Sequence, residues 1–180
     1  WPGFASGSPS SALRDYNSGK YSDALKEYQR TLQNNTNDMR LYFNAGAVAY
    51  RLTNYDEAIR YFRPVLTAQD IKVQQAAYFN LGNAQFRLGA KAESLDSMQE
   101  QWETAIKSYQ NAVVLNTNDM DAAFNLAFVQ NNVKMIIELR EAARRAREAA
   151  DEATRRRNYH RALEIMENLM ANNPTAKQFE

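Results

Sequence analysis

Apolar residues recur every three or four positions along most of this chain, and short polar stretches separate the apolar runs. Within residues 41–66, two such runs flank the polar pair Thr53-Asn54. This spacing places the apolar side chains on one face of a helix, so the stretch is predicted to form two helices joined by a tight turn. Gly46 in the first run and Ala58 in the second are small, which allows the two backbones to approach closely.

The same pattern returns along the chain. Tyr21 and Ala24 precede Tyr55 and Ala58 by 34 residues, residues 78–82 follow 42–46 by 36 residues, and the sequence of residues 35–39 recurs intact at 116–120. Small residues occupy equivalent positions in successive units: Ala12, Gly46, Gly82 and Ala127 in the first helices, and Ala24, Ala58, Ala105 and Ala162 in the second helices. A repeated two-helix unit predicts an all-α, helical-hairpin repeat solenoid.

These residues resemble the tetratricopeptide repeat (TPR), from about residue 10 to residue 176. The resemblance implies a single TPR superhelix with repeats at about residues 10–37, 38–72, 75–118, 119–139 (partial) and 143–176. Residues 1–9, which contain Gly, Pro and Ser, are predicted to form a flexible lead-in. Residues 177–180 are interpreted as the start of a further helix.

Repeat two contains a proline inside its second helix. Asn54 and Glu57 are expected to cap this helix as a capping box, and Pro64 falls about ten residues into it. Since proline removes a backbone donor, the helix should kink or end early.

Repeat three contains an insertion. Trp102 follows Gly89 by 13 residues, which is 11 more than the equivalent spacing in repeat two. Eleven residues are about three helical turns, so a longer second helix would keep its apolar face in phase. A capping box at Ser97 and Glu100 predicts a helix start near Met98, after a less regular lead over residues 90–96.

A long helix is predicted near the C-terminus, because no Gly, Pro or clear hinge occurs between Asn132 and Arg157. An apolar seam recurs there at alternating spacings of four and three: Met135, Leu139, Ala142, Ala146, Ala149 and Ala153. Acidic residues precede Arg by four positions in the pairs Glu141–Arg145, Asp151–Arg155 and Glu152–Arg156. We expect one helix of about 38 residues; the alternative is a break at Asn131-Asn132. A further helix over residues 159–170 would turn Ala162, Leu163, Met166 and Leu169 inward.

Composition excludes several classes of function. Lys and Arg number 22 and Asp and Glu 21, so no overall charge favours nucleic acid. The chain has no Cys, and no stretch approaches the about 18 apolar residues of a membrane span. His160 is the single histidine and lies beside Arg157 and Arg161, where a solvated role is favoured over catalysis. We therefore expect no enzyme, cofactor or metal site. Because the chain begins at Trp1, we expect it to be part of a longer protein, and its location stays open.

The TPR resemblance implies a concave groove lined by the first helices. The family's groove positions fall here on Phe43, Asn44, Ala47, Tyr50, Arg51, Phe79, Asn80, Asn83, Phe86, Arg87, Phe124, Asn125, Phe128 and Asn131. Side-chain amides both donate and accept, so Asn44, Asn80 and Asn125 could pair with the backbone of an extended peptide partner while aromatic rings bury its side chains. The alternative is that these residues only join neighbouring helices.

Two other binding modes receive less support. The chaperone-tail clamp of some relatives needs basic residues where this chain has Ala76 and Asn80, so that activity is not carried over. The Arg-rich stretch 138–161 also contains five acids, and a solvated, salt-bridged face is favoured over a polyanion site.

A second resemblance rests on residues 81–84, the insertion after Gly89, residues 102–106 and 121–126 with Val129, and the ending 173–176. These look like TPR proteins of bacterial aerotolerance (Bat-type) operons. That family would imply an adaptor at the bacterial cell envelope or periplasm, rather than in the cytoplasm, with a von Willebrand factor A domain protein as partner. The alternative function is assembly as a homodimer through residues 135–170, because a long helix covered by one short hairpin leaves apolar surface.

Overall fold

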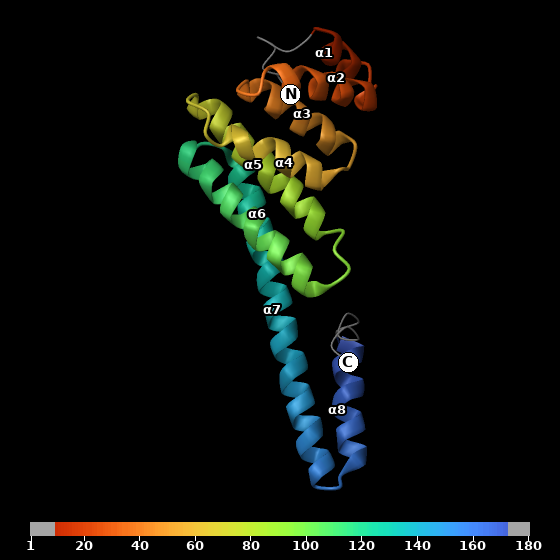
Figure 1. Cartoon of the computed structure of the whole chain (residues 1–180). Helices are drawn as coiled ribbons and strands as arrows, with labels where there is room; N and C mark the ends of the chain where they lie inside the picture. Colours follow the sequence, from red (N-terminus) through yellow and green to blue (C-terminus); the bar gives the residue numbers. More distant parts are fainter. Residues whose placement is uncertain (1–9, 173–180) are drawn as a thin grey trace. The chain divides into compact units, whose positions relative to one another are not determined.

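The computed structural model describes residues 10–172, and these residues form helices without strands. The helices are α1 Ser10–Asn17, α2 Tyr21–Asn34, α3 Met39–Arg51, α4 Tyr55–Val65, α5 Ile71–Gly89, α6 Leu95–Leu115, α7 Met120–Arg155 and α8 Tyr159–Asn172 (Figure 1). The all-α prediction is therefore confirmed. The expectations for residues 1–9 and for residues 177–180 lie outside the described residues. The chain divides into two compact units at residue 130.

The first unit stacks three helical hairpins, α1/α2, α3/α4 and α5/α6, and each helix from α1 to α5 contacts the next one in the chain (Figure 1). A large ring fills the space beside each of the two glycines Gly46 and Gly82 of the first helices. A Cβ atom on Gly46 would lie 2.7 Å from the Phe62 ring, and one on Gly82 would lie 2.8 Å from the Tyr109 ring. Both rings are fully buried, so glycine is required where the ring packs against the helix backbone.

A left-handed residue ends the first helix of three hairpins. Gly19, Thr53 and Arg157 have φ angles of 75°, 58° and 58°. In each case the next residue donates its N–H to a carbonyl five positions earlier, over distances of 2.8, 3.0 and 2.9 Å. This is the hydrogen bond of a Schellman motif, which normally favours glycine at the left-handed position. Thr53 and Arg157 therefore adopt this backbone at a steric cost.

The recurrent sequence at residues 35–39 and 116–120 has a structural role. Asp38 accepts a hydrogen bond from the backbone N–H of Arg40, and Asp119 accepts one from that of Ala122. Asp70 does the same at the start of α5. Each aspartate caps a first helix, because carboxylates satisfy the free N–H groups of a helix N-terminus.

Two predicted capping boxes are wrong. Asn54 makes no side-chain cap; its amide instead donates to the Glu57 carboxylate over 2.7 Å. Helix α6 begins at Leu95, not near Met98, because the Ser94 hydroxyl accepts from the backbone N–H of Ser97 at 3.1 Å. Ser94 thus takes the capping role that was predicted for Ser97.

Pro64 and the insertion act largely as predicted. Helix α4 ends at Val65, one residue after Pro64, and has 11 residues. The insertion lengthens α6 to 21 residues, and its phase is kept: Trp102 packs on Gly89, where a Cβ atom would lie 2.6 Å from the indole ring. The Trp102 indole N–H also donates to the Phe86 carbonyl at 3.1 Å.

The second unit comprises the rest of α7 from residue 131 and helix α8. Helix α7 is one helix of 36 residues, so the predicted continuity is confirmed and the break at Asn131-Asn132 does not occur. Helix α8 follows after a three-residue turn (Figure 1). The ion pairs Glu141–Arg145 and Glu152–Arg156 form as predicted, at 2.9 and 2.8 Å, whereas Arg155 pairs with Glu152 at 3.7 Å and not with Asp151.

The apolar seam of α7 is shifted from the predicted register. Ala142 and Ala149 are exposed, and their neighbours Ala143 and Ala150 are buried instead. Met135, predicted inward, is 64% exposed. In α8, Leu163 was also expected inward but is 58% exposed, while Ala162, Met166 and Leu169 are half-buried. Alanine pairs such as 142–143 satisfy two neighbouring registers equally well, so periodicity alone does not select the buried one.

Candidate functional site: a groove on the first helices

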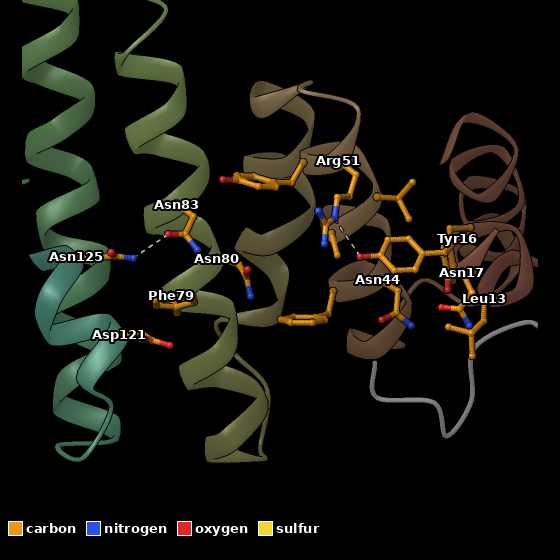
Figure 2. Close-up of a pocket in the computed structure, with 15 residues that line it drawn as sticks. Leu13, Tyr16, Asn17, Asn44, Arg51, Phe79, Asn80, Asn83, Asp121 and Asn125 are labelled. Carbon is orange, nitrogen blue, oxygen red and sulfur yellow. Dashed lines mark hydrogen bonds between the residues drawn. The ribbon is translucent and has the colours of Figure 1, made fainter. Parts of the chain in front are cut away.

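A groove with a volume of about 440 Å³ runs across the first helices of the first unit (Figure 2). Helices α1, α3 and α5 and the first turns of α7 supply most of its walls, and α2 adds Tyr28. Its lining residues are Leu13, Tyr16, Asn17, Tyr28, Phe43, Asn44, Ala47, Val48, Tyr50, Arg51, Phe79, Asn80, Asn83, Asp121 and Asn125. First helices therefore form one continuous concave surface.

The predicted partner-binding residues gather along this surface. Eight of them line the groove: Phe43, Asn44, Tyr50, Arg51, Phe79, Asn80, Asn83 and Asn125. Phe86, Arg87, Phe124 and Phe128 line an adjoining hollow of about 220 Å³, which shares Tyr50, Asn83 and Asn125 with the groove. Ala47 lines the groove, and Asn131 lines neither space. Their role in binding a partner stays a prediction.

Sequence reasoning missed the contribution of α1. Leu13, Tyr16 and Asn17 line the end of the groove, but no residue of the first helix was among the predicted groove positions. A usable signal exists, because Tyr16 precedes Tyr50 by 34 residues, the spacing of the other equivalent positions. Asp121 of α7 was also missed.

The phenylalanines differ in what they do. Phe43 is buried and packs edge-on against Phe62, with ring centroids 5.7 Å apart, and Phe79 packs in the same way on Tyr109 at 6.0 Å. Phe43 and Phe79 therefore support the core as well as the groove wall. Phe124 and Phe128 on α7 are 69% and 47% exposed.

An amide network ties the groove floor to the second helices. The Asn83 side-chain oxygen accepts from the Tyr109 hydroxyl at 2.7 Å and from the Asn125 amide at 3.2 Å. Burial raises the pKa of Tyr109, because its charged form would lose solvation. The Asn80 amide donates to the Ala76 carbonyl of its own helix at 2.7 Å. Asn80, Asn83 and Asn125 are thus oriented by hydrogen bonds, and part of their hydrogen-bonding capacity serves the fold.

Two arginines stand at the C-terminal ends of α3 and α5. The Arg51 guanidinium donates to the Tyr16 hydroxyl at 3.5 Å, and this contact raises the pKa of Arg51 (Figure 2). A hydrogen bond to Tyr50 raises the pKa of Arg87 in the same way, one repeat further on. Asp121 lies at the opposite, N-terminal end of the first helices. The groove therefore has a cationic edge and an acidic corner.

Other chemistry is not assembled in the part of the chain that the structure describes. Residues 10–172 contain no cluster of three or more His, Cys, Asp or Glu side chains that could hold a metal ion. None of the helices described is long and apolar enough to cross a membrane.

Comparison with known proteins agrees with this architecture. A tetratricopeptide repeat family profile matches residues 11–70 and 43–100, which together make up half of the chain. The Hsp70-Hsp90 organising protein of Plasmodium falciparum is 41% identical over 44 residues, which is 24% of this chain and only 8% of that protein.

Two solved structures share the fold. The first TPR of Spaghetti (RPAP3), bound to an HSP90 peptide, superposes with a TM-score of 0.58 at 19% identity, covering 69% of this chain and 88% of that chain. A TPR protein of the thermophile Thermus thermophilus gives a TM-score of 0.57 at 16% identity, covering 91% of this chain and 88% of that chain. With the family profile, the helical hairpins and the small residues at their contacts in agreement, the chain belongs to the tetratricopeptide repeat family.

Proposed function

We propose that this chain is an adaptor that binds an extended segment of another protein in the groove of its first helices. The observation that carries the proposal is the continuous surface shared by the groove and its adjoining hollow, with ordered amides, two arginines and exposed phenylalanines. Amides can pair with a peptide backbone, and the aromatic rings can cover its apolar side chains.

The RPAP3 repeat was solved with an HSP90 peptide, which supports peptide binding by this kind of fold. The chaperone-tail clamp is not part of the proposal, because Ala76 and Asn80 replace its basic residues on α5. The Bat-type resemblance adds one candidate, a von Willebrand factor A domain protein, which can be tested directly as a purified partner.

The test fills the groove without changing its charge. Ala47 lines the groove and is half-buried, so Ala47→Phe should occupy the space of a ligand. A displayed library of random peptides is selected on the wild-type chain, and enriched peptides are titrated against both proteins. We expect the variant to lose at least about tenfold in affinity, since a well-packed contact is replaced by a clash. The matched control is Ala142→Phe, at an exposed position on α7 outside the groove.

Circular dichroism and thermal melting test whether Ala47→Phe is folded. If it is unfolded, the double variant Asn17→Ala/Asn80→Ala is used instead, because it removes polar groups of the groove without adding a bulky side chain. Enriched peptides that bind both groove variants as tightly as the wild type would show that the groove is not the binding surface.

A second candidate function is self-association through residues 135–170. The second unit exposes apolar side chains on both helices: Met135 is 64% exposed, Tyr159 64% and Leu163 58%. No described residue of α8 is buried. Light scattering at high micromolar concentration tests this function, because a monomer there rules it out.

A further inference from the structure

Two arginines of the groove and its adjoining hollow, Arg51 and Arg87, lie beside tyrosines rather than acids. The Arg51 guanidinium donates to the Tyr16 hydroxyl at 3.5 Å, and Arg87 lines the hollow together with Tyr50. A phenol is uncharged at neutral pH, so each guanidinium keeps its full charge. Neither arginine takes part in any ion pair found among residues 10–172, and both are exposed.

Other arginines of the chain behave differently. Arg30, Arg145 and Arg156 each contact a glutamate of their own helix at 2.8 to 2.9 Å. These pairs satisfy the charge locally, as on an ordinary solvated helix face. Arg51 and Arg87 instead carry charges that no ion pair compensates, and they line the groove and the adjoining hollow, respectively. That combination is what a site for carboxylates requires, since the guanidinium fork binds them with directed hydrogen bonds.

An apolar surface adjoins the second arginine. Phe86, Phe124 and Phe128 share one hollow with Arg87. The Phe128 ring lies 5.8 Å from that of Phe86 and 6.4 Å from that of Phe124. Phe124 is 69% exposed although its ring stacks on that of Phe128, so it leaves an apolar surface uncovered. A bulky apolar side chain of a ligand would cover it.

We infer that the ligand is a peptide segment with two acidic side chains followed or preceded by one bulky apolar side chain. This inference rests on the proposed function of the groove. The carboxylates would contact Arg51 and Arg87, and the apolar side chain would cover Phe124 and Phe128. These contacts lie in the order α3, α5, α7 along the groove.

The spacing follows from the fold. Helices α3 and α5 contact each other directly, and packed helices lie about 8 to 10 Å apart. An extended chain advances about 3.3 Å per residue, so the two acidic residues should stand two or three positions apart. Two arginines on different repeats need two carboxylates. Because a peptide has only one C-terminal carboxylate, we assign the two carboxylates to acidic side chains.

Asp121 sets a limit on the number of acids. It lines the same groove near the start of α7, so a uniformly acidic segment would place a carboxylate against it. The ligand is therefore mixed in character, with acidic residues confined to the edge formed by the ends of α3 and α5. Raising the salt concentration should weaken binding but not abolish it, because the apolar contact is not screened.

The experiment uses the full chain and designed peptides with acetylated and amidated ends. The parent peptide carries two glutamates three positions apart, with leucine two positions beyond, and a second peptide carries the same residues in reverse order. Replacing either glutamate by glutamine should weaken binding of the better parent by about tenfold, as should Arg51→Gln or Arg87→Gln. Peptides with glutamine in place of glutamate should bind Arg51→Gln, Arg87→Gln and the wild type with the same affinity. Arg63→Gln, an exposed arginine of α4 outside the groove, is the matched control and should change nothing.

Three results would overturn the assignment. One is equal binding of glutamate and glutamine peptides, and another is a requirement for a free C-terminal carboxylate. The third is that the random library yields peptides without acidic residues that bind the wild type but not Ala47→Phe. This last result would leave the groove as the binding surface and reject only its preference for acids. Insensitivity of all selected peptides to Ala47→Phe would instead reject the groove itself.

Discussion

The two units of this chain are stabilised by different interactions. In the first unit, Tyr28, Phe62 and Tyr109 are fully buried between helices that contact one another. In residues 131–172 of the second unit, the buried positions are Val133, Ile136, Ala143 and Ala150, and α8 has none. Alanine is the strongest helix former, and ion pairs four residues apart support the helix surface. The first unit thus depends on tertiary packing and the second largely on local helix stability.

This difference should appear in unfolding experiments. Burial of a large side chain contributes far more than burial of a methyl group. In repeat proteins, each repeat is stabilised mainly by its neighbours, so a thinly packed end can open before the rest. The predictions below test this contrast, beginning with the largest expected change.

Truncating a large apolar side chain in each unit should separate the two units most clearly. Phe62→Ala removes a fully buried ring beside Gly46 and should lower the free energy of unfolding by about 4 kcal/mol. Met166→Ala, at a half-buried position of α8, should cost less than about 1 kcal/mol. Urea denaturation followed by circular dichroism measures both. Similar losses for the two variants would contradict the contrast.

Overpacking gives the next largest effect. Gly82→Leu places a Cβ atom 2.8 Å from the ring of Tyr109, one helical turn after Ala105. Because Tyr109 is fully buried and hydrogen-bonded, it cannot move aside easily, and we expect a loss of about 3 kcal/mol. Ala142→Leu adds a similar volume at an exposed position of α7 and should be nearly neutral. An unchanged melting temperature for Gly82→Leu would mean that the packing of α5 on α6 is wrong.

The sequence predicted most of the helices because their apolar periodicity is strong and their small contact residues recur. It failed where two neighbouring residues offer the same chemistry. Ser94 and Ser97 can both cap a helix, and Ala142 and Ala143 can both face inward. Only tertiary contacts decide between them. The groove positions came with the resemblance to the repeat family, whereas the contact between Tyr16 and Arg51 across repeats depends on how adjacent hairpins stack, which no local pattern encodes.

A buried tyrosine should make the first unit sensitive to alkali. Tyr109→Phe removes the hydroxyl that donates to Asn83 and should cost about 1 kcal/mol at neutral pH. The pKa of Tyr109 is raised in the folded state. The unfolded chain therefore releases this proton first, near pH 10, and the wild type loses stability as the pH rises further.

The variant lacks this contribution, so the stability difference between the two proteins should shrink above about pH 10. Urea denaturation at neutral and alkaline pH measures it. Tyr159→Phe, in the second unit, is the control, because Tyr159 is 64% exposed. A stability difference that stays constant with pH would show that Tyr109 titrates normally.

The smallest effect compares the same turn in both units. Thr53 and Arg157 each occupy the left-handed position of a Schellman motif, where Gly19 stands in the first hairpin. Thr53→Gly should stabilise the chain by about 1 kcal/mol, because a β-branched side chain is strained at this backbone angle and glycine is not. Arg157 is unbranched at its β-carbon, so Arg157→Gly should gain less, about 0.5 kcal/mol.

The stabilisation by Arg157→Gly is moreover confined to a hairpin with little buried surface. We therefore expect Thr53→Gly to raise the midpoint of global urea unfolding, and Arg157→Gly to leave it unchanged while slowing hydrogen exchange in residues 159–172. If both substitutions raised the global midpoint equally, the two units would unfold as one, and the difference in packing would have no energetic consequence.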